Sequence, residues 1–125
     1  MSYELIWEPQ GVVKRFWGHV SDNDILNAVN SVCGDSRFDD LRFVINDLTG
    51  VESQSVSGAA IEYYAAERIG ALQCNPRIAS PFVASSPSAL AIVKAVTSPA
   101  LGTEHPWRIF SKVGDAREWL TSCGI

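Results

Sequence analysis

Two short runs of alternating apolar and polar residues open the chain and predict a β-hairpin. The first strand covers residues 3–7 and the second covers residues 12–17. Between them, Glu8-Pro9-Gln10-Gly11 suits a tight turn, because proline presets the second position and Gly11 can take the left-handed conformation after it.

Farther along, apolar residues recur three and four positions apart, which predicts helices. Each helical segment is preceded by a serine, whose side-chain oxygen can accept a hydrogen bond from the first turn. Glycine and an Asn-Pro pair favour termination of the first two. We therefore expect helices that start at Ser21, Ser57, Ser86 and Ser111, the first two ending at Gly34 and Asn75-Pro76.

Three more strands alternate with these helices. Residues 41–48 have a continuous apolar middle, which indicates a central strand buried on both faces. Residues 78–84 form the next strand, and Pro81 within it indicates an edge position or an irregular backbone. With a last strand over residues 107–110, the order ββαβαβαβα predicts an α/β fold. We expect one domain over residues 1–125, with a mixed sheet that is mostly parallel after the hairpin.

The end of the central strand is the predicted site. There Asp47 is followed by an expected turn and a polar loop that leads to a helix. At a helix start the backbone N–H groups are unpaired, and the helix dipole favours an anion or an acceptor on a partner. The candidate binding residues at this place are Asp47, Thr49, Gly50, Ser55, Ser57 and Gly58.

Aromatic residues and one histidine extend the set of candidates. Trp7 and Trp17 could face each other across the hairpin, as cross-strand pairs do, but we favour packing in the core for each of them. An exposed aromatic patch beside Tyr63 and Tyr64 would mark a protein contact or a lipid-facing pocket. His105, in the loop over residues 98–106, would act as an acid or base if that loop folds over Asp47.

Charge and hydropathy exclude several classes of partner. The net charge is −4 and the basic residues are scattered, which argues against nucleic-acid binding. No apolar run approaches the length of a membrane span, and the first twenty residues lack a secretion-signal pattern. We therefore expect no membrane insertion.

The cysteines and acids predict neither a disulfide framework nor a metal site. Three cysteines lie far apart at positions 33, 74 and 123, and are expected to be buried or half-buried thiols in the reducing cytoplasm. Asp39, Asp40 and Asp47 have a spacing that matches no ion-binding loop. No cofactor is predicted.

Three segments, together with the order of elements, carry a resemblance to a known family. They are residues 7–13, 37–47 and 116–120. Through them nearly the whole chain resembles the SpoIIAA-like (STAS/SEC14) group of small bacterial proteins. The resemblance implies a STAS-like fold, and it is weak for function because one fold hosts many roles.

In the anti-sigma-factor antagonists of that group, an Asp-Ser-Ser-Gly or Asp-Ser-Thr-Gly motif follows the strand, and a partner kinase phosphorylates its first hydroxyl residue. Aligned without a gap, this chain has Ser55-Val56-Ser57-Gly58. Valine, which has no hydroxyl, therefore stands at the phosphoacceptor position. Ser57 would serve only through a one-residue shift, and we expect it to cap the helix instead.

Several functions stay open at this point. The leading hypothesis is a non-enzymatic regulatory or interaction module whose contact surface includes residues 48–58, with another protein or a second copy as partner. The SEC14 side of the resemblance implies a carrier that holds a small apolar or lipid-like ligand between the alanine-rich helix and the sheet. A phosphorylation-regulated antagonist and an enzyme that uses His105 with Asp47 complete the set.

Overall fold

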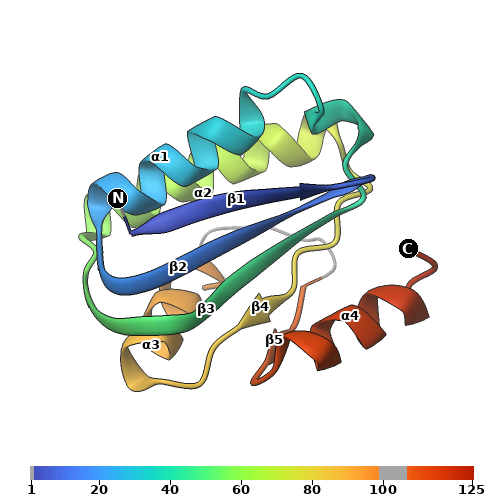
Figure 1. Ribbon diagram of the computed structural model, residues 1–125. Helices are drawn as coiled ribbons and strands as arrows, with labels where there is room; N and C mark the ends of the chain where they lie inside the picture. Colours follow the sequence, from blue (N-terminus) through green and yellow to red (C-terminus); the bar gives the residue numbers. More distant parts are fainter. Residues whose placement is uncertain (1, 99–106) are drawn as a thin grey trace.

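The chain folds into a five-stranded mixed sheet with helices on both of its faces (Figure 1). The computed structural model describes residues 2–98 and 107–125, so the predicted loop with His105 lies outside the described residues. The elements are β1 (Tyr3–Glu8), β2 (Gly11–Ser21), α1 (Asp22–Cys33), the 3-10 helix η1 (Phe38–Asp40), β3 (Phe43–Ser55), α2 (Gly58–Cys74), β4 (Phe82–Val83), α3 (Pro87–Val96), β5 (Ile109–Phe110) and α4 (Val113–Ser122).

The strands lie in sequence order, β1-β2-β3-β4-β5, with β1 antiparallel to β2 and the other neighbours parallel. The predicted order ββαβαβαβα, the mixed sheet and the central position of β3 are confirmed. Each of the three crossovers moves one strand along in the same direction, so right-handed connections place α1, α2 and α3 on one face. α4 packs against β3, β4 and β5 on the opposite face (Figure 1).

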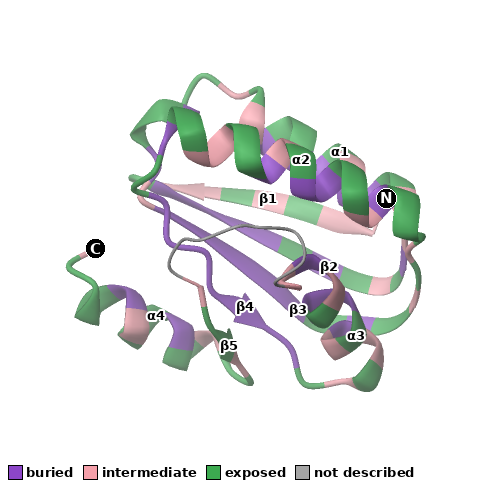
Figure 2. Cartoon of the chain, turned by 180° about the vertical axis from the view of Figure 1, so that it is seen from behind, coloured by how far each residue is buried: buried purple, intermediate pink, exposed green. Residues whose placement is uncertain are grey.

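Both faces of β3 are buried over residues 43–48, as the continuous apolar middle predicts (Figure 2). Toward α1, α2 and α3, Leu48 joins a core that includes Phe16 and Val20. Toward α4, Ile45 packs with Val13, Val83, Ala116 and Leu120. Ile45 is 0% exposed, so it lies at the centre of the second core.

β3 is longer than the sequence pattern predicts. The expected turn and loop over residues 48–58 is instead strand as far as Ser55, because β2 continues to Ser21 and supplies a parallel partner throughout. Register shifts after Asp47 and after Val51 each leave one extra residue in β3. These irregularities and the polar outer residues remove the alternation by which a strand is recognised.

The hairpin turn is formed differently from the prediction. Gln10, not Gly11, has the positive φ, at 64°. Gly11 is needed for another reason, since a Cβ there would lie 2.0 Å from the ring of Phe43. The glycine therefore permits close contact between the hairpin and β3.

β4 is an inner strand and not an edge strand. It pairs with β3 on one side and β5 on the other. Pro81 precedes its two residues, and the Pro81 carbonyl accepts the Asn46 N–H at 2.9 Å, so the missing proline donor costs the sheet no bond at this point. Of the two alternatives that Pro81 indicated, an edge position or an irregular backbone, the second is correct.

The helix starts follow the serine prediction in three of four places. Ser57 and Ser86 accept the N–H groups of Ala60 and Ala89, each at 3.1 Å. At the start of α1, the Asp24 carboxylate accepts the Ser21 N–H at 2.9 Å. The prediction for α4 was wrong, since its N-cap is Lys112 and not Ser111.

The structure excludes the Trp7–Trp17 pair and corrects the expected burial of two of the three cysteines. Trp7 lies opposite Val12 and not Trp17, and the Arg37 guanidinium stacks 3.8 Å from its ring centroid. Cys33 is half-buried as expected, whereas Cys74 and Cys123 are exposed; all three are free thiols. Both exposed cysteines end a helix on its solvent side.

Replacing Ile45 with alanine should destabilise the protein by about 2 to 5 kcal/mol, because it leaves a cavity between the sheet and α4. Ser55→Ala is the control, and this exposed position should change stability by no more than about 0.5 kcal/mol. Urea unfolding of both variants measures the difference. Equal losses would mean that the core has been misplaced.

Candidate functional site

The structure divides the predicted site residues among separate places. Asp47, Thr49 and Gly50 lie along β3 on the face that α4 covers in part, whereas Ser55, Ser57 and Gly58 lie at the end of the sheet where β3 leads into α2. Tyr63 is 46% exposed and Tyr64 is 7% exposed, so Tyr63 faces solvent while Tyr64 packs in the main core. The candidate residues therefore do not lie together in one loop.

An open sheet face is the first of these places. Paired residues share a face of a sheet, so Glu4 lies beside Arg15 and Ile6 beside Val13, on the side opposite α1 and α2. Arg15 and Glu4 form an exposed ion pair at 3.5 Å. Trp17 and Ile6 are 41% and 42% exposed, which leaves large apolar side chains in contact with solvent. Glu4, Arg15, Trp17, Thr49 and Gly50 line a shallow depression of about 330 Å³ on this face.

Asp47, Thr49 and Gly50 shape this open face. The Asp47 carboxylate is buried and accepts both the Thr49 N–H at 3.0 Å and the Thr49 hydroxyl at 2.7 Å. This pair of bonds holds the irregular segment of β3. At Gly50 a Cβ would lie 3.0 Å from the Cβ of Trp17, so the missing side chain leaves room for the tryptophan. Gly50 therefore lies directly beside Trp17.

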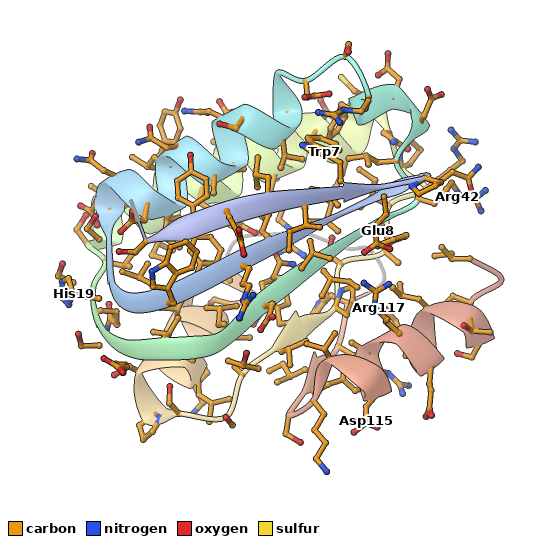
Figure 3. All side chains as sticks on the ribbon, in the orientation of Figure 1. Trp7, Glu8, His19, Arg42, Asp115 and Arg117 are labelled. Atoms are coloured by element: carbon orange, nitrogen blue, oxygen red, sulfur yellow. The ribbon has the colours of Figure 1, made fainter. Side chains whose placement is uncertain are left out.

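The far end of the sheet carries a histidine that sequence reasoning did not select. His19 Nδ1 lies 2.7 Å from the Ser53 hydroxyl and Nε2 lies 2.9 Å from the Ser55 hydroxyl. Figure 3 shows His19 at the opposite end of the sheet from Glu8 and Arg117. Both ring nitrogens face hydroxyls, so neither is left for the carboxylate that orients a catalytic histidine. The cluster ties β2 to the outer part of β3.

Ser57 links the starts of two helices. Its N–H and its hydroxyl donate to the two carboxylate oxygens of Asp22, each at 2.7 Å. The same hydroxyl oxygen accepts the Ala60 N–H, which confirms the capping role. Hydrogen bonds from the Ser57 backbone and side chain lower the pKa of Asp22. Val56 beside it is half-buried and packs against the main core.

A cavity of about 50 Å³ lies between α1, α2 and the sheet. Tyr64, Arg68 and Lys14 line it, and all three are less than 10% exposed. Sequence reasoning missed Lys14, although the strand alternation places it between Val12 and Phe16 on the core-facing side of β2. It also missed Arg68, because a charged residue is seldom buried, whereas Arg68 is 7% exposed and its apolar neighbour Ile69 is 39% exposed.

Across residues 2–98 and 107–125, no three His, Cys, Asp or Glu side chains gather as metal ligands would. Within the same ranges, no helix is long and apolar enough to cross a membrane.

Comparison with known proteins identifies the fold. The solved structure of the anti-sigma factor antagonist SpoIIAA in its unphosphorylated form superposes with a TM-score of 0.57 and 13% sequence identity. The match covers 98% of this chain and 99% of that chain. The chain has a SpoIIAA-like fold. No family model matches the sequence, and a search of curated proteins gives no match. At this level of identity the similarity establishes the SpoIIAA-like architecture and leaves the role to the residues.

Ser57→Ala should raise the pKa of Asp22 toward its ordinary value, because the carboxylate loses one of its two hydrogen bonds from Ser57. An NMR titration of the Asp22 carboxyl carbon measures the shift, and Ser53→Ala is the control that leaves this carboxylate untouched. An unchanged pKa in Ser57→Ala would show that Ser57 does not hold Asp22 in solution.

Proposed function

We propose that this protein is a non-enzymatic interaction module that binds a protein partner constitutively through the open sheet face. The observation that carries the proposal is the exposure of Trp17 and Ile6 on a sheet face that α4 leaves partly uncovered. Large apolar side chains on a shallow surface, next to charged groups, are typical of protein contacts. The SpoIIAA-like fold supports a regulatory role of this kind.

The composition of the face favours a specific contact. Tryptophan and arginine are enriched among residues that dominate binding energy, and Trp17 is two positions from Arg15 on the same strand. Gly50 and the Asp47–Thr49 bonds support Trp17 from β3, so the anchor is placed by the sheet and not by a mobile loop. A partner would meet a surface that is already formed.

Binding is proposed to be independent of phosphorylation. The residue at the aligned acceptor position, Val56, has no hydroxyl and packs against the core. The next hydroxyl, Ser57, is engaged by Asp22 at 2.7 Å and by the first turn of α2. A phosphate on Ser57 would meet the Asp22 carboxylate, and like charges at this distance repel. These contacts argue against the antagonist switch.

The other hypotheses receive less support. A lipid would not fit the cavity beneath α1 and α2, since its volume is about 50 Å³. An engineered apolar cavity of roughly 150 Å³ is what holds benzene. The proposed enzyme needs His105, which lies outside the described residues. We keep the cytoplasm as the proposed compartment, since the three cysteines are unpaired.

A photo-crosslinking side chain in place of Trp17 should capture one discrete partner in cells of the native host. The same replacement of Tyr63, which is comparably exposed on α2, is the matched control and should not capture it. The mass of the product distinguishes a second copy of this chain from another protein. Capture from position 63 with equal yield would contradict binding through the open face.

Phosphopeptide mapping of the protein from its host should find no stoichiometric phosphate on Ser55 or Ser57. The physical reason is the engagement of Ser57 by Asp22 and the loss of the acceptor at position 56. Abundant phosphoserine at position 57 would overturn constitutive binding and favour a switch of the antagonist type.

A further inference from the structure

The first strand leaves one edge of the sheet open. β1 has β2 on one side, and within the described residues no strand lies beyond it (Figure 1). The Trp17 N–H donates to the Ser2 carbonyl at 3.1 Å, which fixes the alternation of hydrogen bonds along this antiparallel pair. The even-numbered residues of β1 therefore bond to β2, whereas the backbone N–H and C=O groups of Tyr3, Leu5 and Trp7 point outward.

β1 lacks the features by which proteins protect an exposed strand edge. It is 6 residues long, contains no proline or lysine, and pairs with β2 without a bulge. Glu4 is engaged within the chain by an ion pair with Arg15 at 3.5 Å. Glu8 is engaged by Arg117 at 2.6 Å. The opposite edge, β5, has only 2 residues, so β1 is the edge that offers a template for another strand.

A second copy of β1 fits this edge in one register. In a continuous sheet, a two-fold axis normal to the sheet places two β1 strands antiparallel, with their outward-pointing residues opposite one another. With Leu5 on the axis, each Leu5 faces the other, and each Glu4 faces Ile6 of the second copy. A shift of two residues would place Glu4 opposite Glu4 in one direction and opposite Glu8 in the other. Only the Leu5 register uses nearly the whole strand and keeps like charges apart.

The Leu5 register also satisfies the backbone groups of the open edge. Leu5 exchanges its N–H and C=O groups with Leu5 of the second copy, and Tyr3 does the same with Trp7. The side chains of these three residues pack against the cores on the face toward α1. The two Leu5 side chains therefore meet beneath the helices, and an aromatic cross-strand pair of Tyr3 with Trp7 forms twice.

The helix above this edge presents no charge that would oppose the contact. α1 packs against both β1 and β2, so it lies over the boundary between them. Two copies of α1 would run antiparallel, two strand spacings or about 10 Å apart, which is the distance between packed helices. Although the net charge of the chain is −4, the exposed residues of α1 are all uncharged: Asn23, Asn27, Asn30 and Ser31. A surface that meets its own copy is favoured by this neutrality, since like charges would face each other.

From this complementarity we propose that two copies of the chain join through their β1 edges into one continuous sheet, with Leu5 on the two-fold axis. α1 of each copy packs beside α1 of the other. Trp17 lies on β2 and makes none of these contacts, so the dimer stands or falls independently of the proposed function.

Sedimentation equilibrium of the full chain measures the dimer directly. The protein should associate to twice the chain mass with a Kd on the order of 10 μM. Amide hydrogen exchange then locates the contact. Exchange at Tyr3, Leu5 and Trp7 should slow as the protein concentration rises through the Kd, whereas exchange at Ile109 on β5 should not change.

Charge at position 6 tests the register. Ile6→Glu should raise the dimer Kd at least tenfold, because it places a carboxylate opposite Glu4 of the second copy on both sides of the axis. Ile6→Lys places an ammonium there instead and should dimerise at least as tightly as the unmodified chain. Ile6 is 42% exposed, so both variants should fold. Ile109→Glu, at a residue 41% exposed on the β5 edge, is the matched control and should leave the Kd unchanged.

Leu5→Pro tests the hydrogen bonds across the axis. Proline lacks the N–H that Leu5 donates to the second copy, whereas the bonds from β1 to β2 use the even-numbered residues and remain. The variant should abolish the dimer, and the Ile6 pair keeps the proposal testable if it fails to fold. Trp17→Ala should leave the Kd unchanged, so the dimer and the contact through the open face can fail separately.

Several results would overturn the proposal. One is a chain that stays monomeric up to about 500 μM, which would leave the edge to a different strand or to solvent. Another is a dimer whose Kd changes less than twofold in Ile6→Glu. Equal weakening by Ile6→Glu and Ile6→Lys would show a register in which position 6 meets itself, and weakening by Ile109→Glu would place the contact at β5.

Discussion

The parallel pairing of β2 with β3 determines which side chains each layer of helices meets. It runs from Gly11 beside Phe43 to Ser21 beside Ser55. Because paired residues share a face, this register determines which side chains lie on each face of the sheet. A slip of one residue would exchange the two faces and expose the cores above and below β3.

Two neighbouring residues of β2 consequently serve opposite faces. Lys14 points with Asn46 into the cavity beneath α1 and α2, and Arg15 lies on the open face with Asp47. The irregular segments of β3 then bring Gly50 beside Trp17. The SpoIIAA-like architecture thus places an interior cation and an exposed tryptophan within a few residues of each other. The two features are independent of each other, because neither side chain depends on contacts that the other makes.

Local signals were enough to predict much of this fold. The capping of α2 by Ser57 and of α3 by Ser86 depends on residues within one helical turn, so it is readable from sequence. The outer part of β3 is not, because its polar residues form a strand only through a partner more than thirty positions away. The cavity could have been suspected from Lys14 at an inward position of β2. The depth of the cavity depends on which side of α2 faces the sheet. The sequence did not reveal that side, because Arg68 is buried although charged residues are usually exposed.

Both the open face and the end of the sheet follow from the extension of β3 to Ser55. Amide hydrogen exchange followed by NMR tests it directly, because a strand protects the N–H groups that face its neighbour. We expect alternate amides over residues 50–55 to exchange slowly, at rates comparable with those of β2 residues 17–21. Uniformly fast exchange over residues 50–55, beside slow exchange over residues 43–48, would contradict it and restore a loop at this position.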